Sequence, residues 1–145
     1  MTRSLPIARD AFITAMNRDT AGSDRPRYTE VLDAMIEWSL ARPELLRFRD
    51  DESSKGVVSF QRVGSNMVFW AARPMRGNGP KIELLPRASS VLPDERLHSA
   101  REAINACSRE VLEGDDRLAI GFGAMKNPTS RVAVFTLMTE LLEVT

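Results

Sequence analysis

The connections between residues 44 and 87 constrain the fold more than any other feature of this chain. Four segments there alternate apolar with polar side chains, a pattern typical of strands: ELLRFR, GVVSFQRV, NMVFWAAR and KIELLPR. Only Gly64-Ser65 separates the second segment from the third, and residues 74–80 separate the third from the fourth. Parallel neighbours need a crossover of about a dozen residues or more. The sequence therefore predicts an antiparallel meander and disfavours a Rossmann or P-loop fold.

Helical periodicity flanks this sheet on both sides. The expected helices are 8–18, 29–41 and 93–113, with a closing helix within residues 127–144. Residues 117–125 fit either a fifth strand or an irregular extended segment. Thr129 or Ser130 would cap the closing helix, although residues 131–137 alone fit a strand equally well. The predicted fold class is α+β: an antiparallel sheet of four to five strands, N-terminal helices, a long helix after the fourth strand and a C-terminal helix.

The length of 145 residues suits one domain of ordinary size. We expect residues 28–145 to form that domain. Residues 1–27 add a short helix, with Phe12 and Met16 on one side, and a loop rich in Gly, Ser, Asp and Pro. This N-terminal segment is either an ordered part of the domain or a flexible extension.

Strand register predicts which side chains share a face of the sheet. If Gly64-Ser65 is a two-residue turn, Phe60 lies opposite Phe69 and Ser59 lies opposite Trp70. The core face would then carry Val58, Phe60, Met67, Phe69 and Ala71. The other face would carry Ser59, Gln61, Val68, Trp70 and Ala72, together with Lys81, Glu83, Arg47 and Arg49.

The second face has two interpretations. In one, a helix covers Trp70 and the arginines lie at the edge of that helix. In the other, the face is partly open, Trp70 stacks on a planar group, and basic side chains hold anionic groups. The tentative ligand-binding residues are Trp70, Arg47, Arg49, Gln61, Arg73, Arg76 and Lys81. A homodimer through this face or through an open sheet edge is a further alternative.

The charge distribution favours an anionic partner for the middle of the chain. The whole chain has a net charge of zero, with twenty basic and twenty acidic residues. Residues 42–92, however, hold seven Arg and two Lys against five Asp and Glu, a net charge of +4. The flanking segments are therefore acidic on balance. Nucleic acid is one anionic partner that such a segment could bind.

The catalytic signals in the sequence are weak. His98 and Cys107 lie nine residues apart on one predicted helix, about half a turn out of phase, so they do not form a dyad within it. The segment RGNGPK lacks the spacing and the following helix of a phosphate-binding loop. A single Cys excludes an internal disulfide and multi-cysteine metal sites. No catalytic residue, metal site or cofactor is assigned.

The functional expectation is a small non-catalytic binding or interaction domain, whose ligand is anionic or planar and meets the face that carries Trp70. The alternative is a protein-interaction or homo-oligomeric module with a fully covered sheet and no small-molecule site. No segment resembles a signal peptide or a membrane span, so we expect a soluble cytoplasmic protein without a membrane partner.

Overall fold

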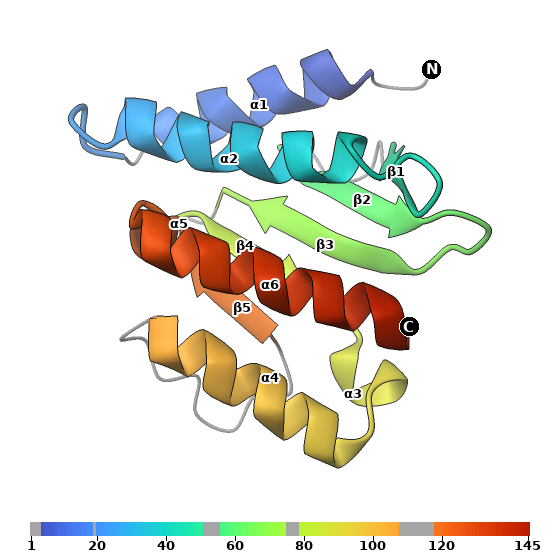
Figure 1. Ribbon diagram of the computed structural model, residues 1–145. Helices are drawn as coiled ribbons and strands as arrows, with labels where there is room; N and C mark the ends of the chain where they lie inside the picture. The colour runs from blue at the N-terminus through green and yellow to red at the C-terminus, as the bar shows by residue number, and fades with distance from the viewer. Residues whose placement is uncertain (1–3, 19, 51–55, 75–78, 108–117) are drawn as a thin grey trace.

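The computed structural model describes residues 4–18, 20–50, 56–74, 79–107 and 118–145. Six helices and five strands are formed by these residues (Figure 1). In chain order they are α1 (Leu5–Asn17), α2 (Arg25–Leu40), β1 (Leu46–Arg49), β2 (Val58–Arg62), β3 (Val68–Arg73), β4 (Lys81–Leu84), α3 (Ala88–Val91), α4 (Asp94–Cys107), β5 (Leu118–Gly121), α5 (Phe122–Met125) and α6 (Pro128–Val144).

The sheet confirms the predicted α+β class. Its strand order is β1-β2-β3-β4-β5, and each neighbouring pair is antiparallel. The segment that fitted either a strand or an irregular stretch contributes the fifth strand, β5. Helices α1, α2, α6 and α4 lie beside one another across one face of the sheet (Figure 1). The other face carries none of the described long helices, and this asymmetry decides where a ligand can approach.

A β-bulge in β3 overturns part of the predicted register. Next to the turn the pairing is as expected, with Gln61 opposite Val68. The register then shifts between Phe60 and Gln61, so that Phe60 pairs with Trp70. Phe69 is the extra residue of β3. Because a shift of one residue turns every following side chain to the other face, the bulge reverses the predicted positions of Trp70, Ala71 and Ala72.

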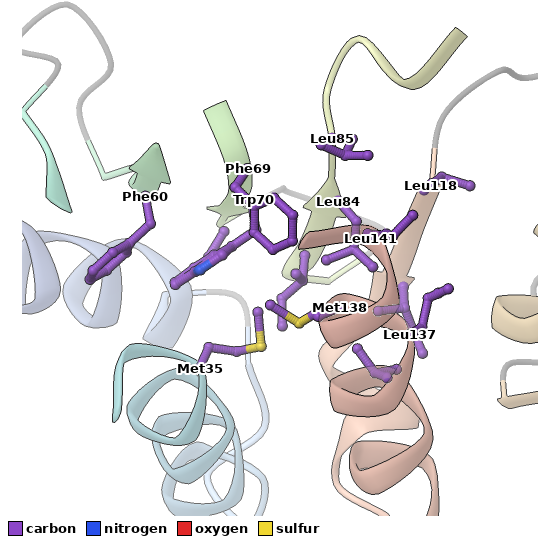
Figure 2. Packing of buried hydrophobic residues seen from close by; sticks show 14 of the residues in the cluster. Met35, Phe60, Phe69, Trp70, Leu84, Leu85, Leu118, Leu137, Met138 and Leu141 are labelled. Carbon is purple, nitrogen blue, oxygen red and sulfur yellow. The ribbon is translucent and has the colours of Figure 1, made fainter. Parts of the chain in front are cut away.

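Trp70 therefore belongs to the core, and its predicted place on the face away from the core is wrong. Its side chain is 0% exposed, and its ring stacks on Phe60 with a centroid distance of 5.3 Å. Its Nε1–H donates to Ser39 Oγ of α2 at 2.7 Å. Figure 2 shows Phe60, Phe69 and Trp70 pointing together toward the helices. Neighbouring Phe69 stacks on Trp38 of α2 at 6.3 Å.

Three helices begin earlier than the apolar periodicity predicts, and α1 is the first of them, starting at Leu5 rather than at residue 8. Helix α2 starts at Arg25 rather than near Thr29, because Pro26 occupies the first turn, where its missing N–H costs nothing. Helix α6 starts at Pro128, and its cap is Asn127 rather than Thr129 or Ser130. The Asn127 Oδ1 accepts a hydrogen bond from the Thr129 N–H at 2.9 Å. The helical interpretation of residues 131–137 is confirmed.

Helix α1 packs into the same core as the rest of the chain. Phe12 is 0% exposed and stacks on Phe122 of α5 with a centroid distance of 5.5 Å. Arg9 donates to both carboxylate oxygens of Asp33 in α2, at 2.6 and 2.9 Å. Apolar packing and a bidentate ion pair therefore both tie α1 to the domain. Among the described helices, none is long and apolar enough to cross a membrane.

Candidate functional site

The sheet face opposite the helices gathers most of the basic residues that the sequence singled out. Since Phe60 and Trp70 face the helices, alternation along the strands turns Arg47 and Arg49 of β1 the other way. Cross-strand pairing adds Gln61, Arg73 and Lys81 to this basic face. Gln61 lies opposite Arg47, and Lys81 lies opposite Arg73. The predicted grouping of these residues is therefore present in the fold, but without Trp70.

Trp70 cannot stack on a ligand in this structure, because its ring is fully buried on the other face of the sheet. Gln61 is also an unsuitable ligand contact. Its side chain is 6% exposed, and its Nε2 donates to the Ser65 carbonyl at 2.9 Å, which holds the β2–β3 turn. Arg76 lies outside the described residues. The open part of the site must therefore come from other side chains.

The centre of the basic face is closed. Ser59 is 5% exposed and Ala71 is 2% exposed. Arg73 lies 3.7 Å from the carboxylate of Glu83, with which it forms an ion pair. Arg47 remains exposed on β1, two residues before Arg49. A ligand on this face would therefore bind toward its margin, where the surface is hollow.

A groove of about 490 Å³ lies at that margin, beside the β2–β3 turn. We call it the Arg49–Arg87 groove. Its described lining residues are Arg49, Asn66, Met67, Val68, Leu85, Pro86, Arg87, Ser90 and Val91. Volumes of about 300–1,000 Å³ are typical of small-molecule sites. The groove is thus large enough for a small ligand and is built from four separate parts of the fold.

Two guanidinium groups supply the charge of the groove. Arg49 reaches from β1 to the β2–β3 turn, where its Nη1 donates to the Asn66 carbonyl at 2.9 Å. Arg87 precedes α3 and is exposed. Within the described part of the chain, neither arginine has a carboxylate partner, and none of the described lining residues is acidic. Because a guanidinium has five N–H donors, most of them remain available to an anion.

The segment between β4 and α3, which forms one wall of the groove, contains a residue with an unusual backbone conformation. Leu85 has a φ of +43°, in the left-handed region that side chains larger than glycine rarely occupy. The next residue is Pro86, which further restricts the backbone of the residue before it. The Leu85 N–H donates to the Phe69 carbonyl at 2.7 Å, and its side chain is 1% exposed. These two anchors fix the direction in which the chain presents Arg87.

The sequence did not identify Arg87 or the α3 wall as part of a site. Arg87 follows the fourth strand, so strand pairing assigns it no neighbour. The sequence offers one usable signal, a Pro-Arg pair directly after the fourth strand of a basic segment. Of the predicted ligand-binding residues that the structure describes, only Arg49 lines the groove.

The other candidate chemical residues lie away from this groove. His98 is exposed on α4, as expected, and its Nε2 lies 3.1 Å from the Glu102 carboxylate. Cys107 is half-buried at the end of α4, packed against the core. Within the described ranges, no group of three or more His, Cys, Asp or Glu residues is arranged to hold a metal ion.

The chain was compared with protein-family models, with curated proteins and with solved structures, and no match was found.

Proposed function

We propose that this protein is a non-catalytic binding domain whose ligand is an anion held in the Arg49–Arg87 groove. The observation that carries the proposal is a pair of arginines at one cavity that have no carboxylate partner among the described residues. Arginine is well suited to oxyanions because its planar fork donates two parallel hydrogen bonds. Arg47, also on the basic face, adds positive potential near the groove without lining it.

None of the described lining residues of the groove is aromatic, which argues against a stacked nucleic-acid base as the ligand. Sequence-tolerant binding of single strands relies on aromatic side chains under successive bases. Trp70, the aromatic residue expected to serve this purpose, is buried. A nucleic acid would have to bind through its phosphates, and its affinity would then fall steeply as salt increases.

We expect the substitutions Arg49→Gln and Arg87→Gln each to weaken anion binding about tenfold or more, because a hydrogen bond to a charged group contributes about 1.5–3 kcal/mol. Isothermal titration would measure these affinities with inorganic pyrophosphate, octanoate and a single-stranded oligonucleotide. A salt concentration of about 50 mM is suitable, because the Debye length is then about 14 Å and charge interactions are only weakly screened. Arg47→Gln is the matched control: it removes the same charge from the same strand and face, outside the groove.

Retention of wild-type affinity for every bound anion in the double variant, with its fold intact by circular dichroism, would contradict the proposal. So would a failure of all three anions to bind the wild-type protein. An oligonucleotide affinity that falls tenfold or more between about 50 and 200 mM salt would identify nucleic acid as the ligand class. If Arg47→Gln and Arg49→Gln lowered the anion affinity equally, the binding site would be the exposed part of β1 and not the groove.

A further inference from the structure

We infer that the ligand of the Arg49–Arg87 groove is an oxyanion joined to an aliphatic body, rather than a compact or polymeric anion. This inference rests on the proposed function and assigns the chemical class of its ligand. Three observations support it: the residues that line the groove, the volume of the groove, and the burial and ion pairing of the residues around it on the basic face.

Apolar side chains make up most of the described lining of the groove. Met67, Val68, Pro86 and Val91 line the groove and are half-buried, so each leaves part of its apolar surface accessible there. A compact polyanion such as pyrophosphate would leave these side chains in contact with water. An aliphatic chain would cover them and gain the free energy of apolar burial.

The described lining residues include few uncharged polar groups. They are Asn66 and Ser90, and the Asn66 carbonyl already accepts the Arg49 hydrogen bond. A sugar or a polyol would need several directed donors and acceptors to replace its bonds to water. Two cationic groups beside a mostly apolar lining are instead complementary to one oxyanion with a hydrocarbon body.

The described residues of the basic face do not extend the groove into a channel long enough for a polymer. Arg73 is engaged by Glu83 at 3.7 Å, and Ser59 and Ala71 are buried in the centre of the face. The groove volume of about 490 Å³ fits a ligand of small-molecule size. A carboxylic acid and the phosphate ester of an alcohol share the required chemistry, because each joins an oxyanion to a chain.

The test is a chain-length series of butanoate, hexanoate and octanoate, titrated into the full-length protein, with octanol and octyl phosphate at matched length. We expect affinity to rise with length by up to about fourfold per buried methylene, and octanol to bind at least tenfold more weakly than octanoate. A stronger affinity for octyl phosphate than for octanoate, with the same dependence on length and on Arg87, would identify a phosphate head group. The reverse order would identify a carboxylate.

A groove variant separates the aliphatic contact from the charge. Val91→Thr places a hydroxyl in the wall at nearly constant shape, so the gain in affinity from hexanoate to octanoate should shrink, and octanoate binding should weaken more than pyrophosphate binding. Val132→Thr is the control, since Val132 is 65% exposed on α6 and lies outside the groove.

The outcomes separate this inference from the proposed function. Arginine-dependent binding of pyrophosphate, with equal affinity for butanoate and octanoate, would overturn the aliphatic class and leave the anion-binding function standing. Equal affinity for octanol and octanoate, unaffected by Arg87→Gln, would overturn both. Failure of every anion to bind would also overturn both.

Discussion

Replacement of Trp70 by alanine is expected to lower the free energy of unfolding by about 3–5 kcal/mol, the range for large aromatic residues removed from a core. Trp70 is 0% exposed, stacks on Phe60 at 5.3 Å and bonds to Ser39 at 2.7 Å. Its removal leaves a cavity at the junction of the sheet and α2. Urea unfolding followed by circular dichroism measures the effect without relying on tryptophan fluorescence.

A double-mutant cycle isolates the hydrogen bond within this effect. Ser39→Ala leaves the buried Trp70 N–H without its acceptor and should cost about 1–3 kcal/mol. In a Trp70→Phe background, which has no N–H to satisfy, the same Ser39 substitution should cost clearly less. A loss below about 1 kcal/mol for Trp70→Ala would mean that the face carrying Trp70 is open and that the bulge in β3 is misplaced.

Replacement of Phe12 by alanine is the second large effect that the fold predicts, again about 3–5 kcal/mol. Phe12 comes from the N-terminal segment that the sequence left as either ordered or flexible. In the structure it is 0% exposed and packs on Phe122, whose ring also contacts Tyr28 edge-on at 5.9 Å. A large loss of stability would show that α1 is part of the folding unit.

The matched control lies on the same helix. Ile7 is 58% exposed, so Ile7→Ala removes a similar aliphatic surface from α1 without opening the core. We expect a change within about 0.5 kcal/mol, as for other surface substitutions. If Phe12→Ala and Ile7→Ala had equally small effects in urea unfolding, α1 would be detached from the domain in solution.

The fold class was predictable because it depends on two robust signals. The connection lengths between residues 44 and 87 left no space for helical crossovers, and the periodicity of the flanking segments was helical. The resulting meander is present with all of its strands. Helix starts were less accurate, because Pro26 and Asn127 act through local backbone geometry and not through apolar spacing.

The position of Trp70 was not predictable from turn chemistry. Gly64-Ser65 fixed the pairing of Gln61 with Val68 correctly, but one extra residue in β3 reversed the faces beyond it. Nothing in the alternation of NMVFWAAR distinguishes a regular strand from one with a bulge at Phe69, since both place an aromatic residue in the core. The error is local, yet it moves the most prominent aromatic residue to the opposite face.

The site was predictable in part. Alternation along β1 placed Arg47 and Arg49 together on one face, which the structure confirms. Arg87 escaped prediction because its position depends on the left-handed backbone at Leu85, a conformation that a leucine before a proline gives no reason to expect. The groove arises where a strand margin, a turn and a short helix meet, and only the folded chain brings these together.

The most direct test of the groove as a ligand site uses the methyl group of Met67. In protein labelled with ¹³C at the methionine methyls, titration with octanoate should shift the Met67 resonance, assigned with a Met67→Leu variant, because Met67 lines the groove. The buried core residues Met35 and Met138 are internal controls, and their methyl resonances should not shift. A stationary Met67 resonance at octanoate concentrations that saturate binding, or shifts confined to Met35 and Met138, would contradict the Arg49–Arg87 groove as the binding site.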